Sequence, residues 1–146
     1  MGFSWAFIEF GTPDFDCALA LRDIVLRKPL GLEFHSQDIA LEFDQFHLGA
    51  FAEDGTLLGV MTLQDLHHDH TIKMRQVAVT PDRQSQGIGS YLVHVAEIFC
   101  RQKGYQCIVL HARDTAIPFY KRLHYQPIGE EFYEVNILHQ KMEKTL

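Results

Sequence analysis

The sequence has few cysteines and no long apolar run, and each shortage argues against a class of protein. Three cysteines, Cys17, Cys100 and Cys107, form an odd number without the spacing of a metal site. This disfavours a disulfide scaffold, and we interpret them as small core residues of a reduced, cytoplasmic protein. No apolar stretch approaches the roughly 20 residues needed to cross a bilayer, and the N-terminus lacks the basic start of a signal peptide. We therefore expect no membrane partner.

Basic residues are also scarce, because 13 Lys and Arg stand against 19 Asp and Glu, giving a net charge of −6. Nucleic-acid binding depends on clustered Lys and Arg that release counterions, so we predict no nucleic-acid partner. An amine-bearing small molecule or peptide fits this balance better. An anionic cofactor can still be held locally by backbone amides. A homodimer is left open.

The 146 residues, of which 47% are hydrophobic, fit one domain spanning 1–146. Helical spacing of apolar residues predicts helices over 13–28, 36–43, 86–103 and 115–123. Strand patterns cover 4–10, 47–52, 57–66, 71–79, 106–110, 125–128 and 133–142. The run 106–110 is almost entirely apolar and follows a strand and a long helix, which predicts a β-α-β crossover with parallel pairing. The fold class is therefore mixed α/β.

The most informative segment is a glycine-containing turn between the strand 71–79 and the long helix. Amides in the first turn of a helix lack intrahelical partners, and the helix dipole adds about half a positive charge there. Gly87 and Gly89 remove side chains that would keep an anion from this backbone. Because glycine is common in turns, a tight structural connection explains the pair about equally well.

Two phosphate-binding alternatives do not fit this turn. No Gly-Lys-Ser/Thr follows, so it is not a P-loop. A dinucleotide fingerprint would need a third glycine and a downstream acidic residue, and both are missing.

The turn resembles the pyrophosphate loop of the GCN5-related N-acetyltransferase (GNAT) family, which has the form Gln/Arg-x-x-Gly-x-Gly/Ala. Gln84, Gly87 and Gly89 fill that pattern. Ala116, Phe119-Tyr120 and Leu123 resemble the family's Ala-x-x-Phe-Tyr helix, although His124 and Tyr125 replace its Gly-Phe. The segment from His139 to Met142 is similar to a bacterial subgroup that closes with His-x-x-Met.

The resemblance implies a GNAT-like acyl-CoA N-acyltransferase fold, with a splayed central sheet of about seven strands and helices on both faces. It also implies acetyl-CoA as co-substrate, no metal, and transfer of its acetyl group to a primary amine by direct attack on the thioester. Main-chain groups near Val77 would then polarise the thioester carbonyl. The implied cofactor-binding residues are Val77, Ala78, Val79, Gln84, Ser85, Gln86, Gly87, Ile88, Gly89, Ser90, Arg113, Phe119 and Tyr120.

Acetyl transfer needs a proton to leave an ammonium and a proton to reach a thiolate. Tyr120 occupies the family's position for the acid beside the sulfur. His111 and His139 are candidate bases because imidazole titrates near neutral pH. A histidine is more often a hydrogen-bonded structural residue, and the base stays open among these two, a water chain, and Glu33, Glu42 or Glu134.

Other polar and aromatic groups favour simpler explanations. His67-His68-Asp69-His70 has ligand types suited to a metal, but consecutive turn residues rarely surround one ion. We expect surface pairing for Arg22, Arg27 and Arg75, and core positions for the aromatic side chains of the first strand, Phe3, Trp5, Phe7 and Phe10.

Two rival functions remain at this stage. One is a non-catalytic acyl-CoA-binding or regulatory module that keeps the turn but lacks a proton path. The other is a small metal-binding protein built on the histidine turn.

Overall fold

The computed structural model describes residues 2–146, which form two compact units that we treat separately. The first unit contains the residues up to Gln64 and Gln76–Ala96, and the second contains Asp65–Arg75 and Glu97–Leu146. The strands follow the order β1-β2-β3-β4-β5-β8-β6, and β7 pairs with β8. The sheet is open and mixed, and it has eight strands where the sequence predicts about seven.

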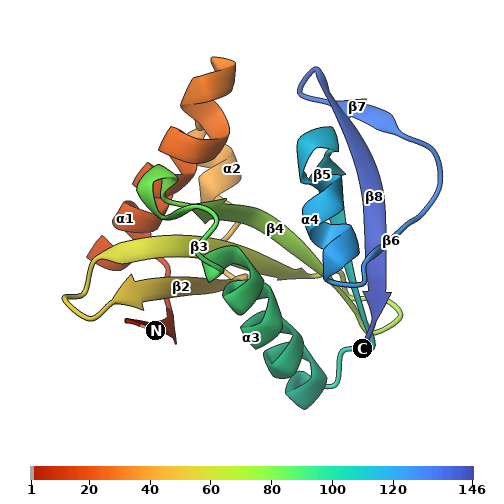
Figure 1. Cartoon of the computed structure of the whole chain (residues 1–146), viewed down its shortest axis with the longest axis horizontal. Coiled ribbons are helices and arrows are strands. Elements are labelled where there is room, and N and C mark those ends of the chain that lie inside the picture. The colour runs from red at the N-terminus through yellow and green to blue at the C-terminus, as the bar shows by residue number, and fades with distance from the viewer. Residues whose placement is uncertain (1) are drawn as a thin grey trace. The chain divides into compact units, whose positions relative to one another are not determined.

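In the first unit, β1 (Phe3–Phe7), β2 (Phe46–Ala52) and β3 (Leu57–Asp65) form an antiparallel meander, whose yellow strands β2 and β3 lie side by side in Figure 1. The predicted Asp-Gly hairpin is confirmed, since Gly55 has φ 89° and Ala52 N donates to Thr56 O. The last part of β4 (Thr71–Val79) belongs to this unit.

Helix α1 (Pro13–Arg22) begins as its sequence predicts, because Thr12 Oγ1 accepts a hydrogen bond from Phe15 N at 3.3 Å. The chain then continues through a π-helical turn (Asp23–Arg27) and a 3₁₀ turn (Lys28–Leu30), and α2 (Ser36–Ala40) follows. The buried side of α1 packs with Ile8, Val60 and Ala78. One part of the first unit's core therefore lies between α1 and the strands.

The opposite face of β3 carries the start of α3 (Ile88–Lys103). A Cβ on Gly59 would lie 3.0 Å from Ile88 Cγ2 and 3.2 Å from Leu92 Cδ1, so the missing side chain lets the helix approach the strand. Val60, the next residue, faces the α1 side instead. The first unit thus has helices on both faces, as predicted.

In the second unit, β5 (Cys107–Arg113) pairs parallel with β4 from Thr71 to Met74 and antiparallel with β8 (Ile137–Thr145). The predicted parallel crossover is therefore confirmed. The short strands β6 (Gln126–Pro127) and β7 (Phe132–Glu134) both pair with β8. A 3₁₀ turn (Asp114–Ala116) leads into α4 (Ile117–Arg122).

The prediction of one closing strand over 133–142 is wrong. The chain reverses at Val135 and Asn136, which have φ 48° and 62°, and this tight turn separates β7 from β8. Two successive residues of positive φ suit a two-residue hairpin turn, but a β-branched valine rarely adopts that conformation. The turn was therefore invisible in the sequence, and it accounts for the eighth strand.

Two core assignments are also wrong. Trp5 and Phe7 are 37% and 50% exposed, because β1 is the first strand in the sheet order and, within residues 2–146, pairs only with β2. Of the three free cysteines only Cys100 is buried, whereas Cys17 is exposed and Cys107 is intermediate. Cys17 is exposed while Phe15, Ala18 and Leu21 form the buried side of α1.

His124 and Tyr125, the departures from the family pattern, have clear structural roles in the second unit. His124 has φ 73°, a conformation that glycine adopts without strain. Tyr125 is buried, and its hydroxyl donates to Glu97 Oε2 at 2.9 Å. Lys144 Nζ lies 3.0 Å from the other carboxylate oxygen, so the buried carboxylate is paired.

Candidate functional site

In the first unit, residues 84–87 form the glycine-containing turn ahead of α3, which we call the cradle. Ser85 and Gly87 have φ 67° and 84°, and Gln84 Nε2 donates to Val79 O at 3.2 Å. Backbone amides at the start of a helix lack intrahelical partners, so this turn has donors that can bind an anion. The sequence therefore predicted correctly that a turn precedes the long helix here.

The structure decides why Gly87 is a glycine. No heavy atom lies within 4 Å of the position where its Cβ would be, so close packing within the chain does not require glycine. Its positive φ favours glycine, and the space around the Cβ position is open to a ligand. Ile88, which follows, is 1% exposed and anchors the first turn of α3. The cradle is therefore open to solvent at Gly87 and held in place by the buried side chain of Ile88.

The end of β4 precedes this turn in the same unit. Gln76 has φ 57° within the strand, which marks an irregularity of the β-bulge type, and Arg27 Nη2 donates to Gln76 Oε1 at 3.2 Å. Ala78 is buried in the α1 core, while Val77 and Val79 are only partly buried. Alternation along the strand thus leaves the two valines on the less covered side.

In the second unit, Tyr120 of α4 packs edge-on against Phe119 and Tyr125, with ring centroids 5.0 Å and 5.8 Å away. Tyr120 is 8% exposed, and burial raises its pKa above the ordinary value of about 10. The phenol therefore stays protonated at neutral pH and is available as a hydrogen-bond donor.

His111, Glu134 and His139 come together in the second unit. Glu134 Oε1 lies 3.2 Å from His111 Nδ1, and Glu134 Oε2 lies 3.6 Å from His139 Nε2. The ring of Phe132 contacts both imidazoles, edge-on at 5.0 Å for His111 and stacked at 5.8 Å for His139. The sequence named all three polar residues as candidates, but it gave no sign that one carboxylate joins the two histidines.

Arg113 ends β5 and pairs in register with His139. Burial lowers the pKa of its guanidinium, and Glu134 partly opposes this shift. Arg113 thus belongs to the same side of the sheet as the two histidines.

The histidine turn is exposed. The side chains of His67, His68 and Asp69 are 77%, 64% and 92% exposed, and His67 N donates to Asp65 Oδ1 at 2.7 Å. Within residues 2–146, no three His, Cys, Asp or Glu side chains gather in a way that could hold a metal ion.

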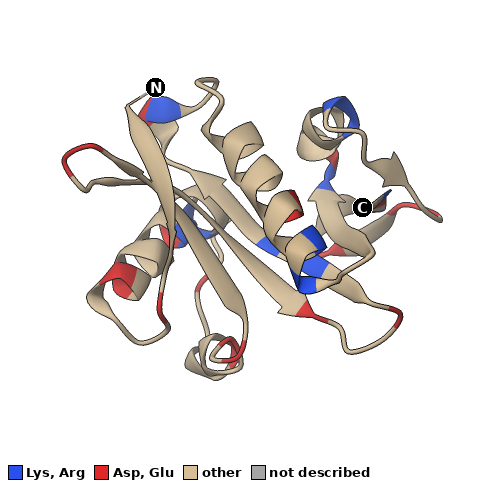
Figure 2. Cartoon of the chain, turned by 90° about the horizontal axis from the view of Figure 1, so that it is seen from below, with Lys and Arg blue, Asp and Glu red and all other residues tan. Residues whose placement is uncertain are grey.

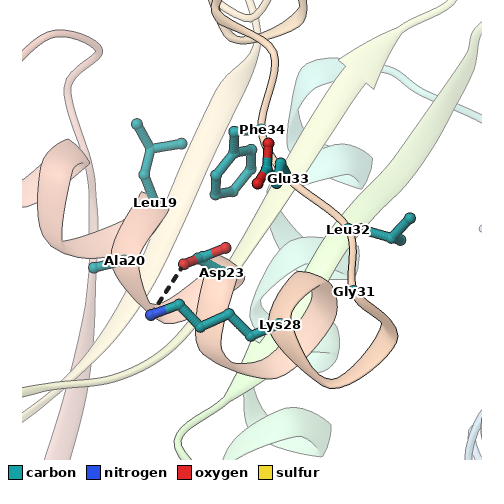
Figure 3. Close-up of a pocket in the computed structure, with 8 residues that line it drawn as sticks. All are labelled: Leu19, Ala20, Asp23, Lys28, Gly31, Leu32, Glu33 and Phe34. Atoms are coloured by element: carbon teal, nitrogen blue, oxygen red, sulfur yellow. Dashed lines mark ion pairs between the residues drawn. The ribbon is translucent and has the colours of Figure 1, made fainter.

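The first unit also has a pocket of about 660 Å³ beside α1 and the turns that follow it (Figure 3). The ion pair between Lys28 Nζ and Asp23 Oδ2, 3.4 Å long, spans one side of it. The guanidinium carbons of Arg22 and Arg27 lie 5.3 Å and 4.7 Å from the centre of the Phe34 ring. The pocket is lined by Leu19, Ala20, Asp23, Lys28, Gly31, Leu32, Glu33 and Phe34.

Figure 2 shows Lys and Arg positions distributed over several elements, with acidic positions in many of the loops. None of the helices in the described residues is both long enough and apolar enough to span a membrane.

Comparisons with known proteins place this geometry in context. The model of the Acetyltransferase (GNAT) domain family matches residues 30–146. The uncharacterized N-acetyltransferase YjcF of Bacillus subtilis is 30% identical over 73 residues, which cover 49% of this chain and 52% of YjcF. The chain thus spans about half the length of this curated relative.

Two solved structures share the fold. A candidate N-acetyltransferase from Lactobacillus plantarum aligns with a TM-score of 0.88 at 20% identity, covering 100% of this chain and 99% of that one. An aminoglycoside 6′-N-acetyltransferase in complex with coenzyme A aligns with a TM-score of 0.82 at 16% identity, covering 97% of this chain and 96% of that one. At these identities the likeness concerns the fold. Because the family match covers most of the chain, this protein belongs to the acetyltransferase (GNAT) domain family.

Proposed function

We propose that this protein transfers the acetyl group of acetyl-CoA to a primary amine, as one catalytic domain over residues 1–146. The observation that carries the proposal is the open cradle at Gly87, ahead of a 16-residue helix in a chain of the GNAT family. The coenzyme A complex of the aminoglycoside 6′-N-acetyltransferase, which shares the fold, supports acyl-CoA as the ligand.

The proposed cofactor site follows the chain from β4 into α3. Main-chain groups of Val77, Ala78 and Val79 bind the pantetheine arm, and the segment from Gln84 to Ser90 binds the pyrophosphate through backbone amides. The open space around Gly87 and the fixed position of Ile88 support this assignment. In the second unit, Arg113, Phe119 and Tyr120 are the further cofactor-binding residues that we propose from the family resemblance.

Tyr120 supports the leaving group in this proposal. An ordinary thiol has a pKa of about 8.5, and burial raises the pKa of Tyr120 above about 10, so full proton transfer to the thiolate is uphill. Donation of a hydrogen bond to the developing thiolate costs no such transfer. We therefore assign Tyr120 as a hydrogen-bond donor to sulfur, with the thiolate taking its proton from the attacking nitrogen or water.

The pocket beside α1 is the proposed place of the acceptor. Glu33 gives it a carboxylate that can bind an ammonium, while Asp23 is already paired with Lys28. Glu33→Gln should raise KM for the amine and leave KM for acetyl-CoA unchanged. Equal KM values for the amine in both proteins would remove the pocket from the acceptor site.

We place the reaction in the cytoplasm, where acetyl-CoA is available and where three free cysteines stay reduced. The test combines calorimetric titration of acetyl-CoA with thiol release over a panel of alkyl diamines, aminoglycosides, amino acid amides and peptides. Binding with thiol release on at least one amine is the expected result. Tight binding without release on any amine would indicate an acyl-CoA-binding module, and absence of binding would overturn the proposal.

A further inference from the structure

One side of the second unit's sheet gathers ionisable side chains from four strands. Lys73 of β4 pairs with Val109, two residues before His111 on β5, and Arg113 pairs with His139 on β8. Phe132 also pairs with His139, which places Glu134, two residues further along β7, on this side. Residues at even spacing share a face of a strand, so Lys73, His111, Glu134 and His139 project from the same face.

The contact between Glu134 and His111 indicates which ring nitrogen of His111 carries the hydrogen. A carboxylate oxygen accepts, so His111 Nδ1, 3.2 Å from Glu134 Oε1, carries a hydrogen. The neutral ring then has its lone pair on Nε2, for which no partner is found among residues 2–146. A carboxylate that holds one ring nitrogen while the other is free is the arrangement that makes histidine an oriented base.

His139 is held differently. Its Nδ1 lies 2.7 Å from the carbonyl oxygen of Ile137, and its side chain is 5% exposed. The side chain of His111 is 28% exposed, so a ligand can reach it. Of the two histidines, His111 is therefore the one that can meet an acceptor.

The surroundings keep His111 neutral at physiological pH. Burial lowers the pKa of His111 below its ordinary 6.5, and the charge of Lys73 lowers it further. Glu134 raises this pKa, and His139 lowers it by a smaller amount. The charged or titratable groups on this face are Lys73 and Arg75 from β4, Arg113 from β5, Glu134 from β7, and His139, Lys141 and Glu143 from β8. Glu134 is the group that stabilises the imidazolium after it takes up a proton.

We propose that His111 Nε2 accepts the proton that the acceptor ammonium loses, and that Glu134 positions the imidazole and stabilises its charged form. The inference rests on the proposed function. One ammonium proton moves to His111 and later to solvent. The amine lone pair then forms the C–N bond, the C–S bond breaks with its electrons on sulfur, and the second nitrogen proton neutralises the thiolate. The balance is one amide, one coenzyme A thiol and one proton released.

The test compares three variants on whichever amine the wild type acetylates. Gln can keep a hydrogen bond to Glu134 but cannot accept a proton, so His111→Gln should lower kcat/KM by roughly 10²- to 10⁴-fold. Glu134→Gln should lower it by on the order of tenfold and shift the acidic limb of its pH profile to lower pH, because Glu134 raises the pKa of His111. His94→Gln, an exposed position on α3, is the matched control and should behave as wild type.

A nuclear magnetic resonance titration of the histidine rings gives a readout that does not depend on turnover. His111 should show the Nδ1–H tautomer, and its pKa should fall in Glu134→Gln. An Nε2–H tautomer, or an unchanged pKa in that variant, would overturn the role of Glu134. Wild-type acetyl transfer together with full activity in His111→Gln would overturn the base assignment alone, whereas a wild type inactive on every amine would overturn the proposed function as well.

Discussion

Arg22 and Glu42 form a bidentate ion pair in the first unit, with Nη1–Oε1 and Nη2–Oε2 distances of 2.7 Å and 2.9 Å. Both side chains are almost fully buried, at 3% and 4% exposure. The pair joins the last residue of α1 to the segment after α2. The Arg22 guanidinium also lies over the Phe34 ring, so it connects the ion pair to the wall of the pocket.

Removal of one partner should therefore destabilise the protein strongly. Glu42→Ala leaves a buried guanidinium without its carboxylate, which costs about 3–5 kcal/mol of unfolding free energy. Lys28→Ala breaks the ion pair with Asp23. Because the Lys28 side chain is 70% exposed, this change should lower the unfolding free energy by about 1 kcal/mol or less. Urea denaturation of both variants measures the difference. Equal losses of unfolding free energy in the two variants would show that burial does not make the Arg22–Glu42 pair more important for stability than the exposed pair.

Gly87→Ala should separate ligand binding from folding. The added methyl group meets no protein atom, so its effect on stability comes from the positive φ and amounts to about 1 kcal/mol. In the proposed cradle the same methyl group displaces the pyrophosphate, and we expect acetyl-CoA affinity to fall at least about tenfold, or 1.4 kcal/mol.

Gly104 offers the matched control for that change. It has φ 92°, no heavy atom lies near its Cβ position, and it follows the other end of α3. Gly104→Ala should lose similar stability and keep wild-type affinity in calorimetric titration. Normal acetyl-CoA binding by Gly87→Ala would remove this turn from the cofactor site.

Tyr120→Phe should lower turnover more than cofactor affinity. The lost hydrogen bond to a developing thiolate is worth about 1.5–3 kcal/mol, which corresponds to roughly a 10- to 150-fold fall in kcat. The ring still packs against Phe119 and Tyr125, so the dissociation constant of acetyl-CoA should change little. Tyr133→Phe, at a position that is 75% exposed, is the control. An unchanged kcat in Tyr120→Phe would rule out the hydroxyl as a catalytic group.

Cys100 should make stability depend on alkaline pH. Burial raises the pKa of its thiol from 9.0 to about 12, so the folded protein keeps a proton that the unfolded chain releases. Between pH 9 and 12 the folded state binds more protons, and stability falls with rising pH by up to about 1.4 kcal/mol per unit from this group. Cys100→Ala should show a shallower decline in urea denaturation between pH 9 and 10. Parallel pH curves for the two proteins would contradict a buried neutral thiol.

Local features of the chain were predictable because their signals are local. Thr12-Pro13 starts a helix, Asp54-Gly55 forms a hairpin turn, and four consecutive apolar residues follow Gln106 in a buried strand. Each element therefore follows from a few adjacent residues. The bounds of β4 agree with the predicted strand from Thr71 to Val79. The turn before α3 was predicted for the same reason, since its two glycines and its place at a helix start lie in one short segment.

Other features depended on contacts that a single segment does not carry. The reversal at Val135 and Asn136 follows from the pairing of Phe132 with His139, which overrides the poor preference of valine for positive φ. Trp5 and Phe7 are exposed because of where β1 lies in the strand order, a property of the whole sheet.

By itself, the sequence determined the main helices and most of the strands, the family, and the segment proposed to bind coenzyme A, since each of these is written in neighbouring residues. Only the tertiary structure decided that the methyl position at Gly87 is open and that Glu134 lies between His111 and His139. Those relationships arise from register between strands and from burial. Residues 23 positions apart meet there because strand pairing aligns them.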